Sequence, residues 1–206
     1  MARVLDKGGI VLALIFGAIL FVYGGFAYLA LMLVFFSLAV IVTKYEYEIK
    51  RDMGLYEHER GWENVLSNGL LPALLAILSS SLGPIPFIAS LAAITADKFG
   101  SEIGVLEAEN PSSLFDFKTV KPGTSGAVSR IGTIASLGGA SAIGFFAMFL
   151  FGITPTTALF LGFAGLAGSI ADTIFGVLEE KGIGTKGTTN FICSLVGALI
   201  GYYLIR

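Results

Sequence analysis

Charged and redox-active side chains are scarce in this chain of 206 residues. Its one cysteine, Cys193, excludes an intrachain disulfide, and its place in an apolar run favours a buried packing residue. The single histidine, His58, lies between Glu57 and Glu59, where a solvated side chain is more common than a metal ligand. The net charge of −2 provides no basic stripe, so no nucleic-acid partner is expected.

The low charge content also argues against a soluble protein. Only 14% of the residues are charged, against about 25% in soluble domains. Hydrophobic residues make up 55%, and the mean hydropathy is +0.83. The bilayer must therefore be the solvent for most of the chain. Because no linker or low-complexity run divides it, we expect one integral membrane domain over residues 1–206.

Seven apolar segments approach the length of about 20 residues that a spanning helix needs. Glycine and proline separate several of them, because these residues stop one helix and start the next. The segments are Gly8–Tyr23, Phe26–Tyr45, Val65–Leu82, Pro84–Gly104, Ser129–Phe151, Pro155–Val177 and Asn190–Ile205. The predicted fold is an all-α polytopic transmembrane helix bundle with about seven spans.

The charge distribution predicts how such a bundle is oriented. With seven spans, every acidic residue and every Lys or Arg except Arg206 falls at one end. A six-span alternative, with the first two segments fused, would scatter these charges less cleanly. By the positive-inside rule, we expect a cytoplasmic N-terminus, an outside C-terminus and a cell-membrane protein with its active site on the cytoplasmic face.

Two acidic residues lie inside the predicted spans. The apolar part of the fourth segment, Pro84 to Ala96, extends only about 20 Å, so the helix must continue past Asp97, which then lies about 10 Å inside the membrane boundary. Asp172 lies a little over one turn before the end of the sixth segment. Intramembrane carboxylates cost about 2–3 kcal/mol each and are usually functional. The alternative is a hydrogen bond between helices, or a pair with Lys98.

A loop rich in glycine, hydroxyl groups and positive charge, KTVKPGTSGAVSR, precedes the fifth segment. Its composition is typical of a phosphate cradle at a helix N-terminus, although its order is not that of a Walker A motif. The candidate residues are Lys118, Lys121, Gly123, Thr124, Ser125, Gly126, Ser129 and Arg130. The alternative interpretation, a flexible juxtamembrane loop, is equally consistent with the composition.

Two weaker polar patterns accompany this loop. The segment KGIGTKGTTN, which contains Lys186 and Asn190, is a second Lys/Gly/Thr loop that follows a helix with an acidic residue and precedes a new helix. This repeated order suggests a parallel internal repeat. Arg60, Asn64 and Asn68 are spaced by four and would share one helix face. That face could border the site or belong to a solvated interfacial helix.

The motifs ADKFGSEIG, KPGTSGAVSRIGT, GSIADTIFG, TTNF and ERGWENVLSNG together resemble a family of small integral membrane proteins. This family was long catalogued as a domain of unknown function and includes the chloroplast phytyl-phosphate kinase. The same segments are distantly similar to phosphatidate cytidylyltransferases and dolichol kinases. The cytidylyltransferases carry the pattern GD…S…KD…PGHGG…DR. Asp97 and Ser101 match its first acid and its serine, and residues 122–126 match PGHGG. Ser129 replaces the aspartate that precedes the arginine of this pattern, which argues against a cytidylyltransferase.

The resemblance implies an isoprenyl-phosphate kinase that transfers a phosphoryl group from CTP, or ATP, to a phytyl, geranylgeranyl or polyprenyl monophosphate in the membrane. Asp97, Glu102 and Asp172 would hold Mg²⁺. Lys121 and Arg130 would act with Asp97 and Asp172 in catalysis, and the remaining candidates would bind the nucleotide phosphates. These are Lys118, Gly123, Thr124, Ser125, Gly126, Ser129, Lys186, Asn190, Ser101 and Asn68.

Three alternatives remain open from the sequence. One is a CTP-dependent lipid cytidylyltransferase, and another is a small transporter coupled to ions through its carboxylates. The apolar, uncharged outer half favours a one-sided enzyme over a transporter. A structural scaffold would leave the two intramembrane acids unexplained. The stripes of small residues could pack within one chain or across a homodimer.

Overall fold

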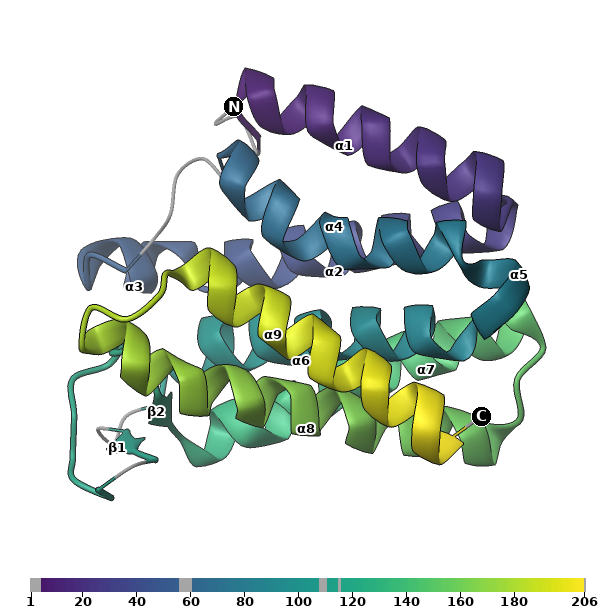
Figure 1. The fold of residues 1–206 in the computed structure, drawn as a ribbon. Helices are drawn as coiled ribbons and strands as arrows, with labels where there is room; N and C mark the ends of the chain where they lie inside the picture. The colour runs from purple at the N-terminus through teal and green to yellow at the C-terminus, as the bar shows by residue number, and fades with distance from the viewer. Residues whose placement is uncertain (1–4, 56–60, 108–110, 115, 206) are drawn as a thin grey trace.

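The computed structural model describes residues 5–55, 61–107, 111–114 and 116–205, and all seven predicted segments are helical (Figure 1). The long elements are α1 (Lys7–Ile19) continued by the π-turn η1 (Leu20–Gly24), α2 (Phe26–Lys44), α4 (Trp62–Ile77) with α5 (Ser79–Leu82), α6 (Ile85–Gly104), α7 (Arg130–Phe151), α8 (Pro155–Glu180), and α9 (Lys186–Ile200) with η2 (Gly201–Ile205). The short elements are α3 (Tyr47–Asp52) and the strands β1 (Ser112–Ser113) and β2 (Ala127–Val128). The all-α prediction is confirmed.

Among the described residues, five helical segments are long and apolar enough to cross a membrane by length and composition. They are Lys7–Gly24, Phe26–Lys44, Arg130–Phe151, Pro155–Glu180 and Lys186–Ile205. The other two predicted spans do not meet these criteria of length and composition, each for its own physical reason. The third is divided at Leu78, between α4 and α5, and α6 carries the charges of Asp97, Lys98 and Glu102. The number of spans therefore stays a prediction.

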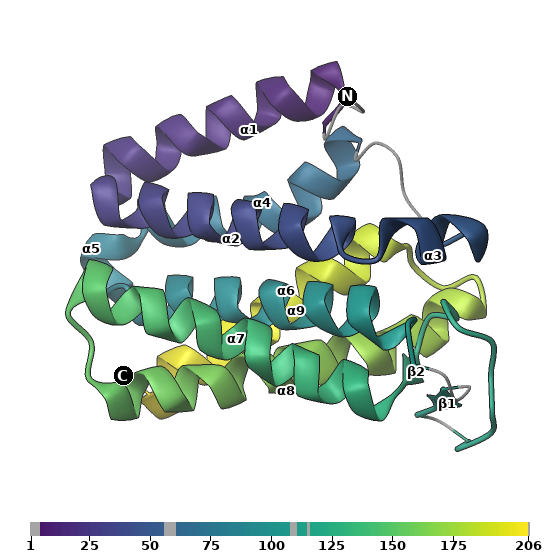
Figure 2. The same ribbon diagram turned by 180° about the vertical axis from the view of Figure 1, so that it is seen from behind.

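The helices lie side by side, and their connections gather at two opposite ends (Figures 1 and 2). The start of α1, the helix α3, the β1–β2 pair and the α8–α9 connection share one end, which we call the charged end. The turn before α2, the helix α5 and the end of η2 lie at the other. The charge pattern predicts this division of the connections between two ends. Arg206, the exception in that pattern, lies outside the described residues.

Helix α6 lies at the centre of the core. It is buried continuously from Pro86 to Ala96. A Cβ on Gly168 of α8 would lie 2.5 Å from Ala93 Cβ, and one on Gly197 of α9 would lie 2.6 Å from the same atom. Small residues thus let three backbones approach within the bilayer, where close packing is a main source of helix association. This crossing lies one turn deeper than Asp97 and fixes its position.

Candidate functional site

A cavity of about 300 Å³ opens at the charged end, between α6, α7, α8 and the loop that leads to β2. Most residues that the sequence singles out meet there. Those lining the cavity are Asp97, Ser101, Gly123, Thr124, Ser125, Gly126, Ser129, Asp172 and Lys186. Segments far apart in the sequence therefore form one site, as the motifs predict.

The two intramembrane carboxylates lie side by side in this cavity. Asp172 is only 8% exposed, and its side chain lies against Asp97 and Thr189 with the charge of Lys186 nearby. Its Oδ1 atom is buried and has no hydrogen-bond partner in the part of the chain that the structure describes. A buried carboxylate oxygen without a partner is costly, so this atom is suited to a ligand that supplies positive charge.

The glycine-rich loop closes over the cavity and is fixed to α8. The backbone N–H of Ser125 donates to Glu180 Oε1 at 2.9 Å. Gly126 has φ +81° and lies so close to α8 that a Cβ on Gly176 would be 2.8 Å from its nitrogen. Gly123, with φ +85°, lies against Leu55. These glycines let the loop backbone approach the cavity closely, as a phosphate cradle requires.

Ser129 connects the loop to the helices on either side. Its side chain accepts a hydrogen bond from the N–H of Gly132 at 3.1 Å, which caps the start of α7. Its hydroxyl also donates to the carbonyl of Gly104, at the end of α6, at 3.2 Å. Ser129 thus ties α6 to α7 beside the cavity, and the N–H of Ile131 in the first turn of α7 donates to Glu107 Oε2 at 3.2 Å.

Three predicted cationic residues lie outside the cavity lining. Lys118, Lys121 and Arg130 are exposed at the charged end. Lys118 forms an ion pair with Asp116 at 3.1 Å, and its hydrogen bond lowers the pKa of the Asp116 carboxyl. These cations contribute a positive field around the opening, while Lys186 is the predicted cation that lines the cavity.

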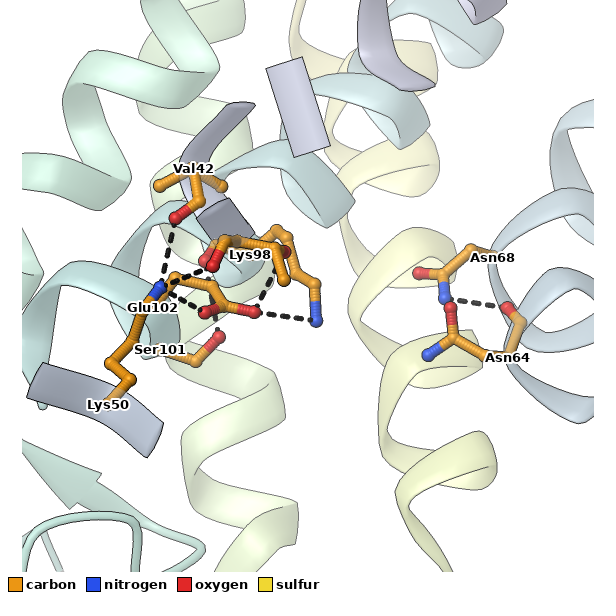
Figure 3. Close-up of polar contacts among 8 residues, drawn as sticks. Val42, Lys50, Asn64, Asn68, Lys98, Ser101 and Glu102 are labelled. Carbon is orange, nitrogen blue, oxygen red and sulfur yellow. Dashed lines mark hydrogen bonds and ion pairs between the residues drawn. The ribbon is translucent and has the colours of Figure 1, made fainter. Parts of the chain in front are cut away.

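The two predicted asparagines also lie outside the lining. Asn68 of α4 donates from Nδ2 to the carbonyl of Asn64 at 2.8 Å (Figure 3). The Asn68 amide therefore forms a hydrogen bond within its own helix. Arg60, the third residue of the predicted polar face, lies outside the described residues. Asn190 of α9 is 6% exposed, and its Oδ1 is buried without a hydrogen-bond partner among the described residues.

Glu102 has a different role from the metal ligand that the sequence suggests. It accepts hydrogen bonds from Lys50 Nζ and Thr43 Oγ1, each at 2.9 Å, and pairs with Lys98 at 3.5 Å (Figure 3). Over the described ranges, no three His, Cys, Asp or Glu side chains form a group that could hold a metal. Glu102 is therefore engaged by cations and lies outside the cavity lining that contains Asp97 and Asp172, and metal binding at these residues stays a prediction.

Sequence reasoning missed several lining residues. Ser136 of α7 and Ser169 of α8 are buried, with their Oγ atoms 3.4 Å apart. Thr173 and Glu179 of α8 also line the cavity. The signal that could have found them is the spacing by three and four, which places Ser169, Thr173 and Gly176 on the face that carries Asp172.

We expect Gly126→Ala to weaken nucleotide binding. The added Cβ would lie 2.5 Å from Val177 Cγ2 and 3.0 Å from the Val177 nitrogen, so the loop must move away from α8. Gly25→Ala is a matched control: Gly25 has φ +83°, nothing lies within 4 Å of its Cβ position, and it is at the opposite end. Both substitutions carry a backbone strain of about 1–2 kcal/mol.

The readout is the dissociation constant for a magnesium nucleoside triphosphate, measured on detergent-purified protein. It should rise about tenfold or more in Gly126→Ala and stay near wild type in Gly25→Ala, since about 1.4 kcal/mol corresponds to a factor of ten. Equal affinity in the two variants would exclude the loop as the nucleotide cradle.

Comparison with known proteins identifies the family of this chain. A family model described as "Integral membrane protein DUF92" matches residues 1–198. The chain belongs to the DUF92 family of integral membrane proteins. An uncharacterised membrane protein of Methanocaldococcus jannaschii is 41% identical over 97% of this chain and 85% of its own length. No solved structure matches.

Two plant members of the family are also similar to this DUF92 chain. "Protein PGR" of Arabidopsis thaliana is 30% identical over 80% of this chain and 72% of its own length. "Protein VTE6, chloroplastic" of the same plant is 26% identical over 96% of this chain and 63% of its own length. The predicted resemblance to this family of integral membrane proteins is therefore confirmed.

Proposed function

We propose that this DUF92 protein is a magnesium-dependent kinase of isoprenyl monophosphates, with CTP or another nucleoside triphosphate as donor. The observation that carries the proposal is the pair of the half-buried Asp97 and the buried Asp172, with Asp172 Oδ1 lacking a partner among the described residues, beneath a glycine-rich loop. The phytyl-phosphate kinase of the same family supports the substrate class.

The residues present fit a bound Mg²⁺. This ion is usually held by one or two carboxylates together with waters and substrate phosphates. Asp97 and Asp172 would supply the carboxylates, and the free Oδ1 of Asp172 is an available oxygen. When bound, the ion would neutralise charge on the transferred phosphoryl group and its leaving group.

The protein's own groups would bind and orient the reactants. The backbone N–H groups of Gly123 and Gly126 and the Lys186 ammonium would hold the donor phosphates, since the N–H groups of Thr124 and Ser125 already donate to Lys121 and Glu180. An oxygen of the lipid monophosphate attacks the γ-phosphorus, the bond from that phosphorus to its bridging oxygen breaks, and the nucleoside diphosphate leaves. The acceptor is already anionic at neutral pH, so no general base is required. Catalysis then rests on positioning and electrostatics.

Two aspects of the environment belong to the same proposal. We place the charged end in the cytoplasm, where nucleoside triphosphates are available, in keeping with the positive-inside rule. The exposed Lys118, Lys121 and Arg130 would attract the anionic donor toward the opening. Apart from Leu166, the described lining residues of the cavity belong to the charged-end halves of the helices or to nearby loops, which favours a one-sided enzyme over a transporter.

The test is the identity of the lipid product. Purified protein is incubated with Mg²⁺, CTP or ATP labelled at the γ-phosphate, and geranylgeranyl monophosphate, and a parallel reaction carries the label at the α-phosphate. The kinase transfers γ-label to a lipid diphosphate. A cytidylyltransferase transfers α-label to a CDP-lipid and releases pyrophosphate. No labelled lipid with either donor, from a monodisperse sample, would refute both.

A further inference from the structure

The contact between α7 and α8 is close over the half of these helices that lies away from the charged end. The two helices are neighbours in both views (Figures 1 and 2). A Cβ on Gly144 would lie 2.7 Å from the carbonyl oxygen of Ala158, and one on Gly165 would lie 2.6 Å from Ala140 Cβ. Even a methyl group would not fit between the helices at these two positions, so this half is closed to a lipid.

This close contact ends where the cavity begins. Its last members are Ser136 and Ser169, whose Oγ atoms are 3.4 Å apart. Nearer the charged end, the loop occupies the space, because a Cβ on Gly126 would lie 3.2 Å from the carbonyl oxygen of Thr173. Ser169 and Thr173 are four residues apart on α8, so these two barriers are separated by about 6 Å along the helix.

Two side chains between these barriers face both the cavity and the outer surface. Thr133 of α7 and Ile170 of α8 line the cavity, yet Thr133 is exposed and Ile170 is 45% exposed. Leu166, one turn deeper on α8, also lines the cavity. We call the gap at Thr133 and Ile170 the lateral opening. In a spanning bundle its outer side meets lipid chains rather than water.

The lateral opening is apolar in character. Thr133 Oγ1 donates to the carbonyl of Ser129 at 2.9 Å, and Thr173 Oγ1 donates to that of Ser169 at 3.0 Å. Both hydroxyls therefore have backbone carbonyls as hydrogen-bond acceptors. The threonine methyl groups and Ile170 remain as the surface that a ligand can contact. A hydrocarbon chain can cross such a surface without leaving a buried polar group unpaired.

The lateral opening is also next to the reactive end of the site. Ile170 precedes Asp172 by two residues, a difference in depth of about 3 Å. A phosphate placed beside Asp97 and Asp172 would therefore have its ester chain at the level of Ile170. The exposed side chains of Ile170 and Thr133 also line the cavity, so the chain could leave the site between α7 and α8.

We propose that the lateral opening admits the tail of the lipid phosphate substrate from the bilayer. This rests on the proposed function and extends it, because it assigns the path of the tail. Ile170 is then a residue that determines specificity for the chain, while the carboxylates determine the chemistry.

The first test compares acceptors of different chain length. Ile170→Trp fills the lateral opening, so the ratio of kcat/KM for geranylgeranyl phosphate to that for the water-soluble dimethylallyl phosphate should fall about tenfold or more. Ile174→Trp is the matched control, because Ile174 lies one turn away on α8, is 53% exposed and is not among the residues lining the cavity. It should leave the ratio at the wild-type value. An unchanged ratio in Ile170→Trp would overturn the proposal.

The second test needs no turnover and so separates this proposal from the proposed kinase activity. A single-chain isoprenyl phosphate that carries a diazirine on its chain is bound without nucleotide, irradiated, and its attachment sites are mapped by mass spectrometry. We expect labelling of residues 131–137 and 166–174, competed by geranylgeranyl phosphate. Labelling concentrated on α1, α2 or α4, or labelling that geranylgeranyl phosphate does not reduce, would contradict the lateral opening.

Discussion

Asp172→Asn should reduce phosphoryl transfer at least about a hundredfold while leaving the protein as stable as wild type, or more stable. Activity falls because the amide keeps the shape and removes the charge that would hold a metal–polyphosphate complex. Stability is retained for a different reason. Asp172 is 8% exposed and its Oδ1 has no described hydrogen-bond partner, so the native carboxylate itself destabilises the fold. Such a separation of activity from stability is typical of a functional site.

The measurement pairs initial rates with thermal melting in the same detergent. Asp52→Asn is the control, because the Asp52 side chain is 70% exposed and paired with Arg51 at the surface, away from the cavity. It should stay within about twofold of wild type in rate. If Asp172→Asn lowers the melting temperature and leaves the rate intact, the carboxylate is a structural group and the proposed site is wrong.

Lys50→Met should have the largest effect on stability. The Lys50 side chain is 1% exposed, and its ammonium donates to the carbonyls of Val42 and Thr43 at 3.1 and 2.7 Å and to Glu102 at 2.9 Å (Figure 3). It thereby satisfies the C-terminal carbonyls of α2 and joins α3 to α6. Methionine fills similar volume but leaves these acceptors unpaired, at a cost of about 3–5 kcal/mol.

The neighbouring Arg51 supplies a control for this substitution. Arg51→Met breaks only a surface ion pair with Asp52, since the Arg51 side chain is 49% exposed, and should cost less than about 1 kcal/mol. Adding Glu102→Gln to Lys50→Met removes the acid that has lost its shorter ion pair, while Lys98 remains at 3.5 Å, and should recover part of the lost melting temperature. A melting temperature for Lys50→Met equal to that of Arg51→Met would show that the buried pair contributes nothing to the fold.

The sequence predicted the helices well because their signals are local. Long apolar runs and Gly/Pro punctuation determine where a membrane helix starts and stops, and each of the seven predicted segments contains helix in the structure. Asp97 and Asp172 could be found for a similar reason, since an acid within an apolar run is rare enough to stand out. Their meeting in one cavity follows from small residues that fix α6 and α8 at the same depth.

The remaining features depend on tertiary packing or on loop conformation. Lys50 lies in a run of charged residues that is typical of a solvated segment, and only its contacts with the end of α2 and with Glu102 make it buried. Glu102 is five residues after Asp97, a rotation of about 140° on a helix, so helical geometry already argued against a shared ligand set. Lys121 and Arg130 could not be placed, because composition does not determine where a long side chain lies.

The central claim is that Asp97 and its neighbours in the cavity transfer a phosphoryl group to a lipid phosphate. Its most direct test is a single-turnover reaction with γ-labelled CTP or ATP, Mg²⁺ and geranylgeranyl monophosphate, run in parallel on wild type and Asp97→Asn at equal concentrations of folded protein. We predict label in a lipid diphosphate for wild type and at least about a hundredfold slower transfer for Asp97→Asn. Equal transfer by the two proteins, or none by wild type, would contradict the account.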